Sequence, residues 1–198
     1  MTSKNTATEI KRHIGGNNSD LYLAQHDGQM WATNRYWLTR GSTVSPLLEK
    51  FNVPADATGQ YEVNGTVRKV RDDAPKVAPM LELAQYDKPL ARARIADRWA
   101  FAADGMGNYL ALFTDPDGNF KAVRADWLDW LRENSTPHAY GERYSEPRYM
   151  LNGSKVAIVA DREVQHGGHI GDDHKMVPVT WENTGPELLA VLMTVKLG

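Results

Sequence analysis

The residues of this 198-residue chain best suited to chemistry lie between His166 and His174. This stretch contains three imidazoles and two carboxylates, with His169 at its centre and the pair Asp172-Asp173 close to its end. Neutral imidazole nitrogens and carboxylate oxygens both ligate zinc, nickel or iron. The spacing matches no standard metal site, and the interspersed glycines are typical of an exposed loop. Both interpretations stay open, and the loop is favoured.

Other patterns in the chain argue against catalysis. Cysteine is absent, which excludes thiolate nucleophiles, disulfides and thiolate zinc sites. The chain has no Gly-x-Ser-x-Gly elbow, and the glycines at Gly15-Gly16 are not followed by the Lys-Ser/Thr ending of a phosphate-binding loop. Acidic pairs such as Asp72-Asp73 point to opposite faces in extended chain. We therefore expect a protein that is not an enzyme, with no cofactor and no metal.

Basic residues form short clusters in a chain of formal charge −2, so any contact with nucleic acid must be a local face. Arg92, Arg94 and Arg98 share one parity within a predicted strand at 91–103, which would place all three on one face toward phosphates. The alternative is a solvated surface balanced by neighbouring acids. The candidate DNA-binding residues are Lys11, Arg12, Lys50, Arg68, Lys69, Arg71, Arg92, Arg94, Arg98 and Arg132.

An internal repeat indicates the elements that position these residues. The segment Tyr22-Leu23-Ala24 recurs as Tyr109-Leu110-Ala111, and each copy is followed by Asp-Gly and a β-prone run. Asp-Gly between apolar runs is a strong hairpin signal, because glycine tolerates positive φ. Further along, Tyr61 and an Asn-Gly pair correspond to Tyr149 and a second Asn-Gly pair. The sequence therefore predicts matching hairpins in two related halves.

A short amphipathic helix is expected in each half. In the first half Ser45 and Pro46 supply an N-cap and a first helical residue, and in the second half Asp126 supplies the cap. The inward-facing residues expected are Leu47, Leu48 and Phe51 in the first helix, and Trp127, Trp130 and Leu131 in the second.

These elements predict an α+β fold with two related β-rich halves, each with antiparallel strands and a short amphipathic helix. A linker at Asp87-Lys88-Pro89 divides the chain into domains 1–88 and 89–198. The Ser-, Pro- and Gly-containing stretch 134–147 is predicted as a long loop. Alternation of residue types at 189–197 predicts a closing strand.

This duplicated plan resembles the domains of sliding clamps, the ring-shaped processivity factors of replicative DNA polymerases. The C-terminal run at 189–197 is similar to the Met-x-Met-Arg-Leu-type ending of bacterial clamps, with Met193, Val195, Lys196 and Leu197 in corresponding positions. Bacterial clamps have three domains, whereas this chain could supply two. A ring would therefore need more subunits.

The resemblance implies a sliding-clamp-like homo-oligomer that encircles duplex DNA without reading its sequence and tethers a DNA polymerase or other replication proteins. It assigns Met193, Val195 and Leu197 to partner binding. The alternative is a non-catalytic, phage-type interaction module or inhibitor of a host protein, acting through exposed aromatics around Trp31, Tyr36 and Trp37. The chain shows no apolar leader and no apolar run of about 20 residues, so we expect a cytoplasmic protein without a membrane partner.

Overall fold

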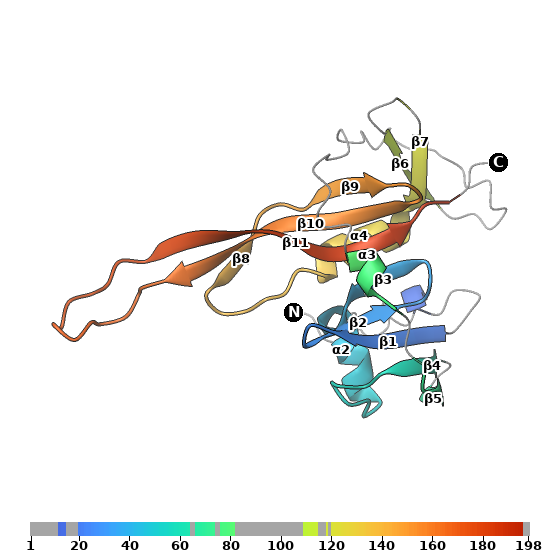
Figure 1. The fold of residues 1–198 in the computed structure, drawn as a ribbon, viewed down its shortest axis with the longest axis horizontal. Coiled ribbons are helices and arrows are strands. Elements are labelled where there is room, and N and C mark those ends of the chain that lie inside the picture. The colour runs from blue at the N-terminus through green and yellow to red at the C-terminus, as the bar shows by residue number, and fades with distance from the viewer. Residues whose placement is uncertain are drawn as a thin grey trace.

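The computed structural model describes residues 12–14, 20–63, 66–73, 76–81, 109–114, 118 and 120–195. These residues form a β-rich α+β structure with antiparallel sheets and few short helices, which confirms the coarse fold class (Figure 1). The strands of the main sheet are β1 (Asp20–His26), β2 (Gln29–Thr33), β3 (Trp37–Arg40), β4 (Gly59–Val63), β5 (Val67–Arg71), β8 (Glu142–Tyr144), β9 (Arg148–Asn152), β10 (Lys155–His166) and β11 (Thr180–Met193).

The main sheet has nine strands in the order β5-β4-β1-β2-β3-β11-β10-β8, with β9 also paired to β10. A separate hairpin is formed by β6 (Leu110–Thr114) and β7 (Phe120–Arg124). The centre of the main sheet joins distant parts of the chain, because β3 pairs with β11 through Leu38 and Val191. The predicted domain boundary at residues 88 and 89 lies outside the described residues, as does the predicted strand at 91–103.

Two predicted hairpin turns are present. Asp27 and Gly28 connect β1 to β2 with φ values of 49° and 73°. Positive φ at both central residues is the requirement of a type I′ turn, which matches the twist of the two strands. The second turn connects β9 to β10 through Gly153, with φ 55°. The Asn-Gly pair of the first half, at residues 64 and 65, lies outside the described residues.

The first predicted helix is α2 (Gly41–Lys50), and it starts five residues earlier than expected. The predicted cap and first residue were wrong, since Pro46 lies inside the helix. The early start places Gly41 close to β2, where a Cβ atom would lie 2.8 Å from Cβ of Met30 and 3.0 Å from its carbonyl oxygen. Glycine therefore lets the chain turn from β3 directly into the helix against β2. The inward position of Leu47 is confirmed, at 1% exposure.

The second predicted helix is α4 (Ala125–Asn134), which follows β7 without a loop. Asp126 lies in its first turn rather than at the cap, and its carboxylate accepts hydrogen bonds of 3.0 and 2.6 Å from the guanidinium of Arg124. The predicted buried stripe is confirmed, because Trp127, Trp130 and Leu131 are all buried.

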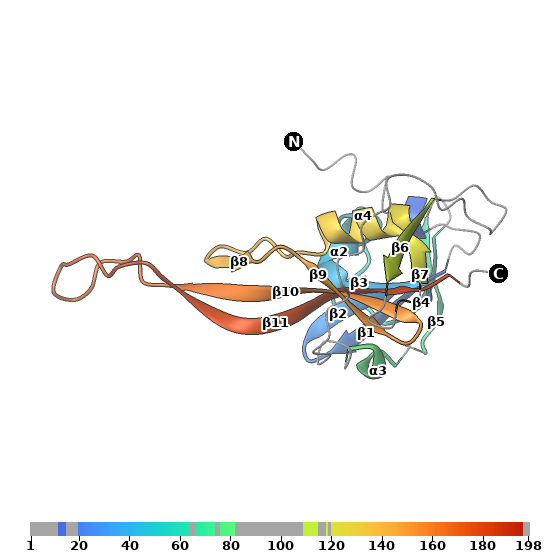
Figure 2. The ribbon, with the colours of Figure 1, turned by 90° about the horizontal axis from the view of Figure 1, so that it is seen from above.

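Alternation along the strands gives the sheet two apolar faces. Leu21, Leu23 and Ile158 pack with α2 and α4, whereas Ala24 and Val159 belong to a second cluster on the opposite face. The second face is covered by the short helix α3 (Ala78–Leu81). Figure 2 shows α2 and α4 on one side of the sheet and α3 on the other. The two longer helices thus share one face.

Two further predictions concern the C-terminal region. The stretch 134–147 was predicted as a loop throughout, but it contains β8 (Glu142–Tyr144), which pairs with β10. A three-residue strand is too short to show alternation, and it is stabilised by a partner strand that follows later in the chain. The closing strand is confirmed, although β11 starts at Thr180 and ends at Met193.

Candidate interaction site: a hairpin arm and the ion pairs at its base

Strands β10 and β11 extend beyond the rest of the sheet as a long hairpin, which we call the arm (residues 161–187; Figures 1 and 2). Before the arm begins, β9 pairs with β10 as far as Val159 and β3 pairs with β11 from Ala190. Within the arm, β8 is the only other described strand that pairs with the hairpin, and it pairs with residues 162–164 of β10. At about 3.3 Å per residue, the stretch from Asp161 to Asp172 reaches roughly 35 Å.

The end of the arm, which we call the tip (residues 167–179), continues the backbone ladder. The N–H of Gly168 donates to the carbonyl of Val177, and the N–H of Val177 donates to the carbonyl of His169, both at 2.9 Å. The N–H of Gly171 donates to the carbonyl of Lys175 at 2.9 Å. The predicted histidine loop is therefore a hydrogen-bonded hairpin end.

The start of the tip requires glycine. Gly167 has a φ of 79°, and a Cβ atom there would lie 2.0 Å from the carbonyl oxygen of Pro178. The positive φ and the close approach of the opposite strand of the hairpin both exclude a side chain at this position. The glycines that suggested a loop in the sequence thus have a specific structural role.

The tip exposes apolar side chains. Ile170 and Met176 face each other in an isolated antiparallel bridge and are 66% and 67% exposed. Val179 is 52% exposed, and Trp181, at the start of β11, is 37% exposed. Neighbouring exposed apolar residues are unfavourable in water and mark interaction surfaces. The tip therefore has the character of a contact site.

The first histidine of the predicted cluster, His166, contacts an acidic residue. The ring of His166 lies 2.8 Å from the carboxylate of Glu182 across the arm, and Lys175 lies 3.3 Å from Asp173. Within the described part of the chain, no group of three or more His, Asp or Glu side chains is arranged to hold a metal ion.

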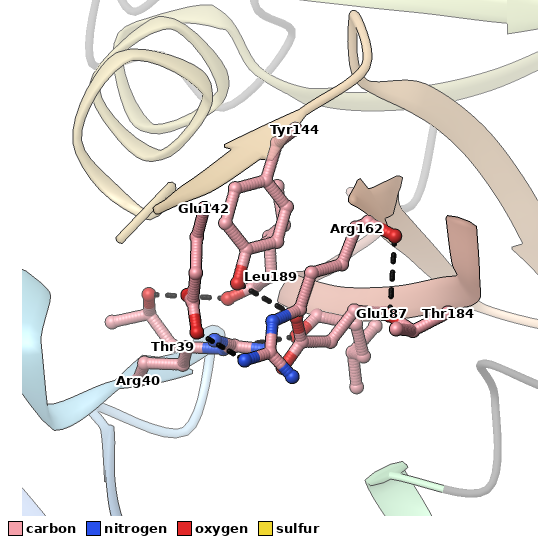
Figure 3. A network of polar contacts seen from close by, with 9 residues as sticks. Thr39, Arg40, Glu142, Tyr144, Arg162, Thr184, Glu187 and Leu189 are labelled. Carbon is pink, nitrogen blue, oxygen red and sulfur yellow. Dashed lines mark hydrogen bonds and ion pairs between the residues drawn. The ribbon is translucent and has the colours of Figure 1, made fainter. Parts of the chain in front are cut away.

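The base of the arm contains a partly buried ion pair that joins it to the body (Figure 3). The guanidinium of Arg40, at the end of β3, pairs with Glu187 of β11 and donates from Nε to the carbonyl of Leu188 at 3.3 Å. The hydroxyl of Tyr144 donates to the same carboxylate at 2.8 Å. Burial, and then the hydrogen bond to Glu187, raise the pKa of Tyr144. Three strands are thereby tied together.

Further ion pairs follow along the arm. Arg148 donates two hydrogen bonds to the carboxylate of Asp161, at 2.6 and 2.8 Å, and these bonds lower the pKa of Asp161. Arg143 of β8 pairs with Glu163 and also lies over the ring of Trp181, 4.2 Å from its centroid. The side chains on this part of the sheet are held by charge pairs rather than by an apolar core.

A cavity of about 410 Å³ lies beside this network. Its wall includes Met30 of β2, Ser42 of α2 and Arg162 of β10, so elements from distant parts of the chain meet there. Arg162 pairs with Glu142 within the same wall. Sequence reasoning missed this network, because no local pattern links residues so far apart in the chain.

The predicted DNA-binding residues lie on several elements. Arg68, Lys69 and Arg71 are exposed on β5, where Arg68 pairs with Glu62 at 3.0 Å and Lys69 pairs with Asp72 at 2.7 Å. These three are close in the sequence, so their proximity follows from the strand itself.

The remaining candidates lie apart from β5. Lys50 is exposed at the end of α2, and Arg132 is exposed on α4. Arg12 lies in the short described segment 12–14. Lys11, Arg92, Arg94 and Arg98 lie outside the described residues.

The predicted partner-binding residues are at the far end of β11 from the arm. Met193 ends the strand, and the N–H of Val195 donates to the carbonyl of Ala122 in β7 at 2.7 Å. Both side chains are half-buried, and Leu197 lies outside the described residues. Among the described residues, no helix has the length and apolar character needed to cross a bilayer.

Comparison of the chain with protein-family models, with curated proteins and with solved structures gives no match.

Proposed function

We propose that the chain is a subunit of a sliding-clamp-like processivity factor, which encircles duplex DNA and tethers a polymerase or other partners. The observation that carries the proposal is the shared face of α2 and α4. Each helix comes from a different part of the chain, and both cover the same side of the sheet. Repeated around an axis, such a unit presents all of its long helices to one central space.

The order of elements supports the duplicated plan. The hairpin β1-β2, the helix α2 and the hairpin β4-β5 of the first half correspond to β6-β7, α4 and β9-β10 of the second, with β3 and β8 as additional strands. Both helices are ten residues long. Each helix follows a strand whose last residue is an arginine with extended backbone. These residues are Arg40, with φ −63°, and Arg124, with φ −65°. The correspondence thus extends to the way each helix begins.

The outer surface of these helices carries mixed charge. Lys50 and Arg132 are exposed beside Glu49, Asp129 and Glu133. Because phosphate binding depends on the number of cations that meet the backbone, this face would bind DNA weakly. A ring does not need strong contacts, since it is retained on DNA by closure. Weak binding to linear DNA and stable retention on circular DNA are therefore expected together.

The test compares circular and linear DNA. Protein incubated with closed circular plasmid is passed through a gel-filtration column, before and after a restriction enzyme cuts the plasmid once. Retention on the circle and release on cutting are expected. A strictly monomeric protein that elutes apart from both forms of DNA would overturn the proposal.

A matched pair of variants tests the helix face. Lys50→Ala with Arg132→Ala removes two cations from α2 and α4, and we expect weaker binding at low salt, with the salt slope reduced by about one for each cation that no longer meets a phosphate. Lys76→Ala removes an exposed cation just before α3, which covers the opposite face of the sheet, and should leave DNA binding unchanged. Equal behaviour of the two variants would exclude the helix face as the DNA surface.

A second candidate function is a non-catalytic protein-interaction module, and the exposed apolar tip favours it. This function requires no DNA contact. Indifference to circular DNA together with a saturable complex between the chain and a protein partner would support it over the clamp.

A further inference from the structure

We infer that the tip of the arm docks on strand β5 of a second copy of this chain. The contact would supply the subunit interface that the proposed ring needs, and in that respect it rests on the proposed function. The contact between two copies is measured without DNA, so the inferred contact and the proposed clamp function can fail separately.

The tip offers an apolar pair beside acidic residues. Ile170 and Met176 lie across from each other and are both about two-thirds exposed. The turn that follows Ile170 carries Asp172 and Asp173, and both residues are exposed. Lys175 partly offsets this charge, since it lies 3.3 Å from Asp173. A partner surface that is apolar at its centre and basic around it would suit the tip.

Strand β5 has that chemistry. It is the last strand of the sheet on its side, and beyond it no further strand pairs among the described residues. Val70 is 46% exposed at its centre, and Arg68, Lys69 and Arg71 are exposed around it. Arg71 makes no ion pair within the described part of the chain. The pairs of Arg68 and Lys69 are exposed, and such pairs contribute little to stability.

The two surfaces lie at opposite ends of the molecule. Figures 1 and 2, which view it from directions 90° apart, both place the tip at one end of the long axis and β5 toward the other. The tip therefore does not reach β5 of its own chain. Complementary surfaces that are separated in this way meet between two copies.

The open edge of β11 at the base of the arm is a poor site for the addition of another strand. The N–H of Asp161 bonds the hydroxyl of Ser145 and its carbonyl accepts from the N–H of Ser145, both at 2.9 Å, so these backbone groups point away from β11. Pro186, the residue paired with Asp161, therefore lies at a position whose backbone groups face the open edge of β11. Proline has no N–H, which weakens that edge as a template for another strand.

The assembly that follows is head-to-tail. Each copy would use its tip in one contact and its β5 in the next, so the interface joins two different surfaces. Interfaces of this kind close into rings when the rotation between subunits permits and otherwise extend into chains.

The experiment measures molar mass by size-exclusion chromatography with light scattering over a range of protein concentration. The tip variant carries Ile170→Asp and Met176→Asp, and the edge variant carries Val70→Asp and Arg71→Glu. We expect oligomers of the natural chain and self-association at least about tenfold weaker in each variant, as for central interface residues. Tyr140→Asp, an exposed residue on neither surface, is the control and should assemble normally.

Mixing the two variants gives the decisive result. The edge variant keeps an intact tip and the tip variant keeps an intact β5, so the mixture should form one-to-one dimers that do not extend. All changes are at exposed positions, and circular dichroism checks that each variant is folded. If either variant fails to fold, a second pair of variants replaces the first. The new tip variant carries Asp172→Lys and Asp173→Lys, and the new edge variant carries Arg68→Glu and Lys69→Glu.

Three results would overturn the inference. These are a natural chain that stays monomeric at its highest attainable concentration, oligomers that survive in both variants, and a mixture that remains monomeric. Binding of the tip to a different protein by a monomeric chain would likewise reject a second copy as the occupant.

Discussion

Strand β10 changes character along its length, and the change separates the body of the protein from the arm. Residues 156–160 are completely buried, with apolar side chains on both faces of the sheet. From Asp161 onward every residue is at least partly exposed, and the first three of them are charged. The backbone ladder to β11 continues through both parts, with two register shifts. One strand is thus stabilised in two different ways.

The body and the arm are stabilised by different interactions. In the body, burial of apolar surface between the sheet and its helices supplies the driving force for folding. In the arm, Arg148 with Asp161 and Arg143 with Glu163 hold the strands in register by cross-strand ion pairs. Ion pairs at partly exposed positions contribute modestly. We therefore expect changes in the body to unfold the protein and changes in the arm to act locally.

The largest effect is expected from Trp37→Ala in the body. Trp37 is 1% exposed, and its ring meets that of Trp130 edge to face at a centroid distance of 5.1 Å. Loss of a buried tryptophan leaves a cavity and should lower the free energy of unfolding by about 3–5 kcal/mol. Urea unfolding followed by circular dichroism measures this. Tyr140→Ala, at a fully exposed site, should change it by less than about 0.5 kcal/mol, and comparable losses in both would contradict the distinction.

A smaller effect is expected from Glu187→Leu at the junction of the two regions. The change leaves Arg40 buried without its carboxylate, and because Glu187 is itself partly exposed we expect a loss of about 2 kcal/mol, below the range for fully buried pairs. The double variant with Arg40→Met removes the unpaired charge and should be more stable than Glu187→Leu alone. A double-mutant cycle by urea unfolding measures the coupling. Simple additivity of the two changes would show that the ion pair contributes nothing.

Local chemistry made part of the fold predictable. The turn at Asp27-Gly28 follows from the φ values that glycine and aspartate tolerate, and the buried stripe of α4 follows from the spacing of Trp127, Trp130 and Leu131. Both signals lie within a few residues of chain.

The arm and its base could not be predicted in the same way. The pairing of β3 with β11 and the contact of Arg40 with Glu187 join residues more than one hundred positions apart, and no local pattern indicates which segment is the partner. The distal part of β10 has the polar composition of a loop, so its sequence alone does not indicate a strand. The histidine cluster was visible as a motif, but its place at the end of a long hairpin depends on the partner strand.

The smallest effect is expected from acid on the arm. The hydrogen bonds from Arg148 lower the pKa of Asp161, so the stabilisation from this ion pair is fully present above the unfolded pKa of about 3.9 and disappears as the pH falls through the lower folded value. Both side chains are partly exposed, so the contribution is below about 1 kcal/mol. Amide chemical shifts followed by NMR should change at Asp161 and Ser145 in this pH range before those of Ile158, and Asp161→Asn should remove the change. Simultaneous changes at all three amides would mean that the arm and the body respond to acid as one unit.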